Sequence, residues 1–372
     1  MPNRLRSTEE AYAALGGAVP ELPALVEAAE GAPLYVVGGA VRDLLLGRGR
    51  TDLDVAVEGD AAAVARRLGG EVLEHQRFAT AKARPGGVEI DLAATRAESY
   101  PHPGALPEVR PARLEEDLAR RDFTVNAMAL PLQGEERLID PHGGREDLEA
   151  GVLRVLHEGS FRDDPTRALR GARYAARFGL APDDRARELI GEADLETVSE
   201  DRRRTELMRL AAEAEAAEAF RLLGEWRILD LDADAPGRVE RVAELLAAPP
   251  WSGVADRSRA LLVAASQPRE PVTSLAAARP DRPSEGVQLA RGARPEELVL
   301  ARALGGGWLD DYVADWRSVM LEIDGRDLLA AGVPEGPPVG RALAAALRAK
   351  LDGEADGRDA ELDVALRAAR SS

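Results

Sequence analysis

The chain has 372 residues and a mass of 39.7 kDa, more than one ordinary domain usually contains, so we expect roughly two to four folded units. Hydrophobic residues make up 45% of the chain and charged residues 31%, which excludes an intrinsically disordered protein. No apolar run approaches the length of about 18 residues that a membrane-spanning helix needs, so no membrane partner is expected.

The chain has no cysteine and only four histidines. It therefore has no disulfide-linked partner and no thiolate zinc site, and this composition is typical of the reducing cytoplasm, where we expect the protein to act. Any bound metal must be held mainly by carboxylates, which favours a hard ion such as Mg²⁺.

The net charge of -17 argues, as a global average, against a protein that binds nucleic acid. Charge must also be considered locally, because arginine supplies nearly all of the 49 basic residues. Arginine suits bidentate recognition of phosphates and bases, although a GC-rich genome would explain the same composition.

Three short runs rich in β-branched residues predict strands, at Leu34 to Val37, Leu53 to Val57 and Val88 to Leu92. From Leu148 onward apolar residues recur at helical spacing, and strand patterns fade. The sequence therefore predicts an α+β head followed by an all-α remainder.

A strand, two glycines and an amphipathic helix follow one another in LYVVGGAVRDLLLG, residues 34–47. Gly38 and Gly39 allow a phosphate to approach the backbone closely, and the helix expected from about Ala40 adds partial positive charge, with Arg42 in its first turn. A triphosphate would fit this turn. An ordinary strand-to-helix turn is the alternative.

Two carboxylates, Asp52 and Asp54, stand two residues apart on a predicted strand. Since side chains alternate along a strand, both point to one face. Such a pair can hold divalent ions about 3.5–4 Å apart for phosphoryl transfer. Asp91 lies on another predicted strand and would face the same site if the two strands pair. A structural pair at the end of a strand is the alternative.

A third cluster lies in EEDLARRDFTVNAMA, residues 115–129, and contains Arg121, Asp122 and Asn126. Charge-assisted hydrogen bonds from such a cluster can read sugar hydroxyls and phosphate oxygens. Alternatively, Asp122 caps a helix that begins at Phe123.

Together with LIDPHGGREDLEAGVLRVL, the motifs GGAVRD, DLD and RRDFTVNAMA resemble the head and neck of the class II tRNA nucleotidyltransferase and bacterial poly(A) polymerase family. The resemblance implies a nucleotidyltransferase head like that of polymerase β, followed by an all-α neck, body and tail. On this basis we expect a catalytic head at 1–145, a base-recognising neck at 146–215, and a tRNA-binding body and tail at 216–372.

The resemblance also implies roles for single residues. Asp52 and Asp54 match the metal ligands and catalytic pair. The triphosphate contacts of the family are matched by Gly38, Gly39 and Arg42. Its ribose and phosphate motif is matched by Arg121, Asp122 and Asn126.

The family reads the base with a Glu-Asp-x-x-Arg motif, which stands here as Asp163, Asp164, Pro165, Thr166 and Arg167. The first position is Asp instead of Glu, which shortens one side chain by a methylene. We expect Arg170, on the same segment, to join the nucleotide site.

Asp164 and Arg167 are three residues apart, so on a helix they would share one face and present an acceptor beside donors. Adenine and cytosine both show an amino donor beside a ring-nitrogen acceptor, whereas guanine and uracil show the reverse. Protein side chains can thus replace a nucleic-acid template. A surface ion pair is the alternative.

The segment 95–112 is rich in proline and glycine and resembles the mobile loop of family members. The alternative interpretation is an ordinary surface loop.

The sequence thus predicts a template-independent enzyme that adds CCA, or part of it, to tRNA from CTP and ATP with Mg²⁺. Five arginines between Arg162 and Arg177 give local positive charge for the RNA, and aromatic residues are too few, at 4%, to favour base stacking. The alternatives are CC-only or A-only addition, a poly(A) polymerase, and a non-catalytic RNA-binding relative.

Overall fold

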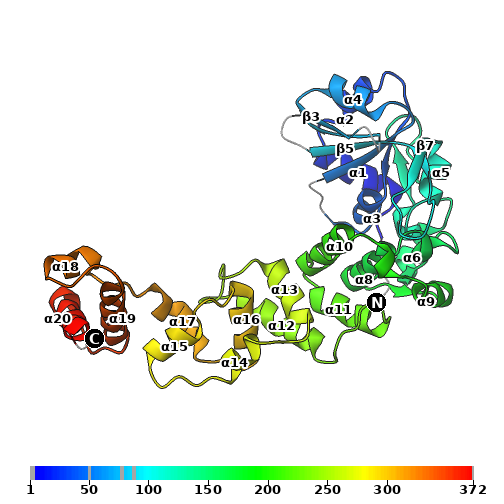
Figure 1. Cartoon of the computed structure of the whole chain (residues 1–372). Helices are drawn as coiled ribbons and strands as arrows, with labels where there is room; N and C mark the ends of the chain where they lie inside the picture. Colours follow the sequence, from blue (N-terminus) through cyan, green and yellow to red (C-terminus); the bar gives the residue numbers. More distant parts are fainter. Residues whose placement is uncertain (1–4, 49–51, 76–78, 86–88, 371–372) are drawn as a thin grey trace. The chain divides into compact units, whose positions relative to one another are not determined.

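The computed structural model describes residues 5–48, 52–75, 79–85 and 89–370, without the side chains of Asp52 and His75. The chain forms two compact units, residues 1–230 and 231–372 (Figure 1). The first unit contains the sheet that the sequence predicted for the head, and the described part of the second consists of helices, so the α+β prediction is confirmed. The finer boundaries at 145 and 215 stay a prediction.

The first unit is built on a six-stranded sheet with the order β3-β4-β5-β2-β1-β8. Strands β2 and β5 are parallel, and the other neighbours are antiparallel. The strands are β1 (Leu34–Val37), β2 (Asp52–Val57), β3 (Glu71–His75), β4 (Thr80–Arg84), β5 (Glu89–Ala94) and β8 (Ala129–Pro131). All three predicted strands are therefore present, and Val88, the first residue predicted for the third, lies outside the described residues.

Alternation along β2 separates the core from the polar face of the sheet. Leu53, Val55 and Val57 are buried in a core shared with four helices of the head. These helices are α1 (Thr8–Ala18), α2 (Leu22–Ala28), α3 (Gly39–Leu45) and α4 (Ala61–Leu68). On the other face, Ala56 packs against Leu118 of α5 (Leu114–Ala119). Asp54, two residues before Ala56 on the same strand, belongs to this second face.

The segment predicted as a loop, 95–112, is a loop only in its middle, and its two ends pair as a β-hairpin, so the prediction is wrong for the paired residues. Strand β6 (Arg96–Ser99) pairs antiparallel with β7 (Glu108–Pro111). The prolines do not prevent pairing, because Pro101, Pro103 and Pro107 lie in the connection and Pro111 ends the second strand, where the missing N–H is tolerated.

Helices of the neck complete the first unit and share its core through aromatic residues. The Phe123 ring lies 6.1 Å from that of Tyr174, edge to face, and 6.3 Å from that of Phe161. The long helix α8 packs against α10 and α11 (Figure 1). These elements are α6 (Gly144–Ala150), β9 (Val152–Leu153), α7 (Ser160–Asp163), α8 (Thr166–Phe178), β10 (Ala181–Pro182), α9 (Asp184–Ile190), α10 (Glu200–Ala212) and α11 (Ala216–Glu225).

Two expected helical segments differ from the prediction. The helix expected from Phe123 is only a three-residue 3-10 turn, η3 (Thr124–Asn126). Asp164 and Arg167 do not share one helix, because Asp164 has an extended backbone, with φ -135° and ψ 91°, between α7 and α8. A proline disfavours the helical conformation of the residue that precedes it, and Pro165 follows Asp164.

The second unit consists of helices throughout its described residues. One of its cores is formed by Ile323, Leu328, Val333 and Ala365 with their neighbours. The helices are α12 (Ala235–Leu246), α13 (Arg257–Ala265), α14 (Val272–Ala277), α15 (Pro283–Leu289), α16 (Pro295–Ala303), α17 (Leu309–Ala314), α18 (Gly325–Ala330), α19 (Pro337–Leu351) and α20 (Gly357–Arg370). Across the described parts of both units, none of the helices has the length and hydropathy to cross a membrane.

Gly144 provides a test of how α6 packs against η3. A methyl group at this position would overlap the carbonyl oxygen of Thr124 and lie 2.8 Å from its carbonyl carbon. We expect Gly144→Ala to lower the free energy of unfolding by about 1–3 kcal/mol, measured by chemical denaturation followed by circular dichroism. The control is Gly16→Ala in α1, where nothing lies within 4 Å. Equal stability of the two variants would contradict the packing.

Candidate active site

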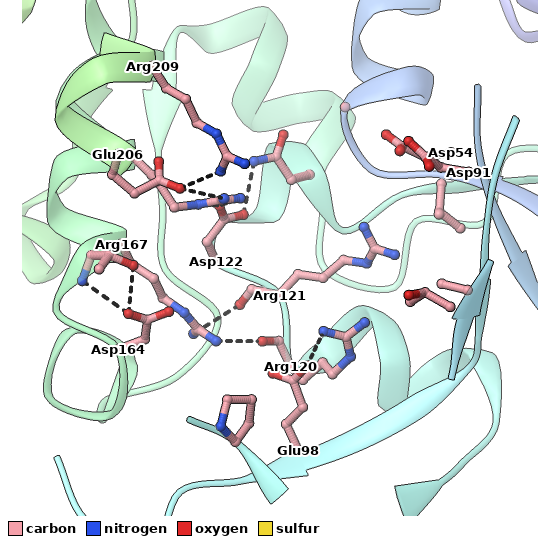
Figure 2. Close-up of a pocket in the computed structure, with 18 of the residues that line it drawn as sticks. Asp54, Asp91, Glu98, Arg120, Arg121, Asp122, Asp164, Arg167, Glu206 and Arg209 are labelled. Carbon is pink, nitrogen blue, oxygen red and sulfur yellow. Dashed lines mark hydrogen bonds and ion pairs between the residues drawn. The ribbon is translucent and has the colours of Figure 1, made fainter. Parts of the chain in front are cut away.

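One cavity of about 1040 Å³ in the first unit brings most of the predicted site residues together. Its walls come from the polar face of the sheet, the turn before α3, the segment before η3, and helices α8 and α10 (Figure 2). The predicted residues that line it are Gly39, Arg42, Asp54, Asp91, Arg121, Asp122, Asn126, Asp164, Arg167 and Arg170. Gly38 and Asp163 are not among the lining residues, and the Asp52 side chain lies outside the described part of the structure.

The sheet places carboxylates side by side at one end of the cavity. Because β2 and β5 pair in parallel, Asp54 is the direct neighbour of Asp91, and the Asp52 backbone is the neighbour of Glu89. Figure 2 shows Asp54 and Asp91 next to each other. The condition set from the sequence for Asp91, that the two strands pair, is met.

These residues fit a hard divalent cation in the chemistry of their donors, which are all carboxylate oxygens. Asp54 would hold such an ion together with Asp52, and Asp91 is the neighbouring carboxylate on β5. The described side chains alone form no group of three acidic or histidine residues around a metal position, and Asp52 is outside that set.

The turn before α3 has the conformation that requires glycine. Gly38 has φ 67° and ψ -130°, and a Cβ there would lie 2.5 Å from Nη1 of Arg121. The glycine therefore lets the Arg121 guanidinium rest directly on the backbone of the turn. The helix begins at Gly39, one residue earlier than the sequence suggested.

Arg42 is buried, with 4% of its surface exposed. Its guanidinium lies 4.1 Å from the centre of the Phe178 ring, donates to Asp43 and donates to Oδ1 of Asn126. Although it lines the cavity, Arg42 thus joins the glycine turn to α8. Contact with a triphosphate stays a prediction.

Asp122 is the centre of a buried hydrogen-bond network and is 6% exposed. Its Oδ1 accepts from the Asn126 side chain and the Phe123 backbone, both at 2.9 Å. Its Oδ2 accepts from Arg170 Nε at 2.8 Å and Nη2 at 2.6 Å. Burial alone would raise the pKa of the Asp122 carboxyl, but the Arg170 charge and the Asn126 hydrogen bond outweigh it and hold that pKa below its usual value.

Arg121 crosses the cavity. It donates from Nη2 to Asp117 at 2.9 Å, while its buried Nε has no hydrogen-bond partner among the described atoms. In Figure 2 the side chain extends toward Asp54 and Asp91. A guanidinium in this place suits an anionic ligand between the two walls.

Asp164 and Arg167 face the cavity from the neck, and each already has protein partners. Asp164 accepts from the Thr166 hydroxyl at 2.6 Å and from Arg202 Nη2 at 2.9 Å. Arg167 donates to Ser160 Oγ at 2.9 Å and to the Arg120 carbonyl at 2.8 Å. Both side chains are therefore held in place before any ligand binds.

The sequence reasoning did not identify several cavity residues on the hairpin, on β4 and on α10: Tyr100, Lys82, Arg202, Glu206 and Arg209. Burial raises the pKa of Tyr100 to about 12. Glu206 accepts from Arg209 at 2.6 Å, and its second oxygen is buried without a partner among the described atoms. The one available signal was the spacing of Arg202 and Glu206, four apart on a helix.

Residues 34–154 match the family model of the poly(A) polymerase head domain. An A-adding tRNA nucleotidyltransferase of Halalkalibacterium halodurans is 50% identical over 152 residues, 39% of this chain and 36% of the relative. A CC-adding tRNA nucleotidyltransferase of Deinococcus radiodurans is 42% identical over 203 residues, 52% of this chain and 54% of the relative. The match thus spans about a third to half of these curated relatives.

Solved structures match over nearly the whole chain. A CCA-adding enzyme in apo form II has a TM-score of 0.82 and 28% identity, covering 98% of this chain and 99% of that one. The Thermotoga maritima CCA-adding enzyme complexed with tRNA has a TM-score of 0.75 and 26% identity, with 98% of both chains covered. A CCA-adding enzyme with ATP has a TM-score of 0.80 and 26% identity, covering 98% and 99%.

Removal of the Asp122 charge tests the central network. We expect Asp122→Asn to lower the free energy of unfolding by about 2 kcal/mol, because Arg170 then loses its charged partner, measured by urea denaturation. The control is Asp163→Asn, since the nearest approach of that carboxylate to Arg162 is 3.9 Å, and it should change stability by less than about 0.5 kcal/mol. Similar losses in both variants would contradict the central role of Asp122.

His157 makes the stability of the neck depend on pH. Arg167 donates to its Nε2 at 3.2 Å, so the neutral ring is favoured, and burial and the Arg167 charge lower the His157 pKa, against Asp163, which raises it. In the unfolded chain the histidine pKa is about 6.5, which is above its pKa in the folded protein. The contribution of His157 to the free energy of unfolding is therefore fully present above about pH 6.5 and is lost as the pH falls, because the unfolded chain takes up the proton first. We expect a smaller loss between pH 7.5 and 5.5 in His157→Gln, measured by urea denaturation. An identical loss would exclude His157 as the cause.

Proposed function

Because this chain belongs to the family of class II tRNA nucleotidyltransferases and bacterial poly(A) polymerases, we propose that it adds nucleotides to the 3′ end of tRNA without a template, with CTP and ATP as substrates and Mg²⁺ as the metal. The observation that carries the proposal is the cavity in which the β2 and β5 carboxylates face Asp164 and Arg167 across Arg121.

In the proposed reaction the terminal 3′-hydroxyl of the RNA attacks the α-phosphate of the nucleotide. A bond forms between that oxygen and the α-phosphorus, and the bond from the α-phosphorus to the bridging oxygen breaks. The hydroxyl proton passes to solvent, and pyrophosphate leaves. Asp52 and Asp54 would hold the divalent cation, which supplies charge neutralisation and an activated hydroxyl when it is bound. Arg121, whose side chain extends toward Asp54 and Asp91 in Figure 2, would bind the triphosphate.

Asp164 and Arg167 would select the base. Arg167 is 5% exposed and tied to the Arg120 carbonyl, and Asp164 is tied to Arg202, so neither side chain has to be ordered when a nucleotide binds. An acceptor and a donor held at fixed positions match the shared edge of adenine and cytosine. Guanine and uracil would leave buried groups unpaired, which costs about 1–3 kcal/mol per group.

Full CCA addition is the specificity we favour. The solved CCA-adding enzymes match over 98–99% of their length. The Thermotoga maritima structure holds tRNA, which supports tRNA as the substrate here. Since the net charge is -17, the contacts with RNA must come from local groups of arginines.

An extension assay tests the function directly. Purified protein, Mg²⁺ and each labelled nucleoside triphosphate are combined with three tRNAs that end before CCA, after C and after CC. We expect CCA on the first substrate and no incorporation of UTP or GTP. A stop after CC, or extension of the CC-ended tRNA alone, would instead identify a partial enzyme. Long A tails would identify a poly(A) polymerase, and no incorporation would identify a non-catalytic relative.

Asp54→Asn is the matching catalytic variant. Loss of a metal ligand removes several kcal/mol of transition-state stabilisation, so we expect transfer to fall by roughly a thousandfold or more with the fold retained. Glu135→Gln, an exposed carboxylate away from the cavity, should leave the rate unchanged. Full activity of Asp54→Asn would contradict the metal assignment.

A further inference from the structure

The third strand of the polar face, β4, places cations beside the carboxylates of β5. Lys82 is the direct neighbour of Asp91 across the β4–β5 pair, and Asp91 is the neighbour of Asp54 across the β5–β2 pair. Direct neighbours on adjacent strands point to the same face. The cavity face thus carries a row of carboxylate, carboxylate and ammonium across three strands.

The ammonium of Lys82 contacts both carboxylates of β5. Its Nζ lies 3.0 Å from Oδ1 and 3.2 Å from Oδ2 of Asp91, and 2.8 Å from Oε1 of Glu89. The other oxygen of Glu89 accepts from Arg84 Nε at 2.9 Å and Nη2 at 2.5 Å. The negative charge of β5 is therefore matched by cations of β4.

A lysine at position 82 is unusual for this chain, whose basic residues are nearly all arginine. Lys82 and Lys350 are its only lysines, and all other basic side chains except histidine are arginine. An ammonium is a compact point charge that can sit between two carboxylate oxygens, whereas a planar guanidinium binds from outside. The Lys82 side chain is 42% exposed and that of Asp91 is 35% exposed, so the ion pair is open to the cavity.

We propose that Lys82 occupies the Asp91 carboxylate and thereby sets how tightly a divalent cation binds beside Asp54. Neighbouring strands lie about 4.8 Å apart, so Asp54 and Asp91 are close enough to share an ion, and the ammonium competes for the same oxygens and repels the incoming charge. Lys82 is a positioning residue for the metal site. A nucleotide that brings its own negative charge would offset this repulsion, so the metal enters mainly with the nucleotide.

The inference rests on the proposed function, because it assumes that this face binds a divalent cation. Its test uses binding and not catalysis. The full-length protein is titrated with Mn²⁺ in the absence of nucleotide, and free Mn²⁺ is followed by electron paramagnetic resonance. We expect Lys82→Met to tighten Mn²⁺ binding roughly tenfold, because the Asp91 carboxylate is then no longer paired with an ammonium and can bind the ion.

Asp91 provides the second arm of the test. Asp91→Asn should change the affinity of the otherwise unaltered protein less than twofold, since the carboxylate is already paired with Lys82. In the Lys82→Met background the same change should remove the whole gain. Lys82→Arg keeps the charge and should keep the weak binding. Arg66→Met removes a positive charge from an exposed position of α4 and should not change Mn²⁺ affinity.

The proposal is overturned if Lys82→Met binds Mn²⁺ no tighter than the unaltered protein, or if the gain survives Asp91→Asn. Lys82→Gln gives the same comparison if the methionine variant does not fold. The predicted Mn²⁺ shift without any nucleotide addition would refute the proposed function alone, and normal CCA addition without the shift would refute the role of Lys82 alone.

Discussion

The ion pair between Asp122 and Arg170 joins the two walls of the cavity. Asp122 belongs to the segment before η3, Arg170 lies on α8, and Asn126 extends the network to Arg42 beside the glycine turn. A buried carboxylate without its cation would be costly, so the neck helix cannot leave this position without exposing both charges to imperfect partners. The distance between the sheet carboxylates and the neck residues therefore depends on this pair.

The sequence predicted the parts of the site that depend on local periodicity. Alternation along β2 put Asp54 on the polar face, and the apolar neighbours of Asp91 marked a second strand whose pairing brought the two carboxylates together. The glycine turn was also recognisable from two consecutive glycines. In the structure Gly38 adopts a positive φ, and Arg121 lies against its backbone. In each case a few consecutive residues contain the necessary information.

The parts that the sequence did not predict depend on contacts between distant residues. Arg167 donates to the Arg120 carbonyl, 47 positions away, and no spacing signals a bond to a backbone oxygen. The hairpin at 95–112 was hidden because its prolines suggested a loop, although its Glu98 side chain accepts from Arg120 at 2.7 Å and fixes the strand against the head. The break at Asp164 was available locally, since Pro165 follows it, but the three-residue spacing to Arg167 suggested one helix.

Ion pairs of this kind determine the local charge of the cavity in a chain that is acidic as a whole. A cavity in a protein with a net charge of -17 can bind an anion only if its carboxylates are neutralised where the anion lies. Asp122 with Arg170, Asp164 with Arg202 and Asp91 with Lys82 are such pairs along one cavity. Each fixes a carboxylate and leaves a cation at the cavity wall. The local field is thus set by pairing, and the acidic remainder of the chain does not have to change for the cavity to accept an anion.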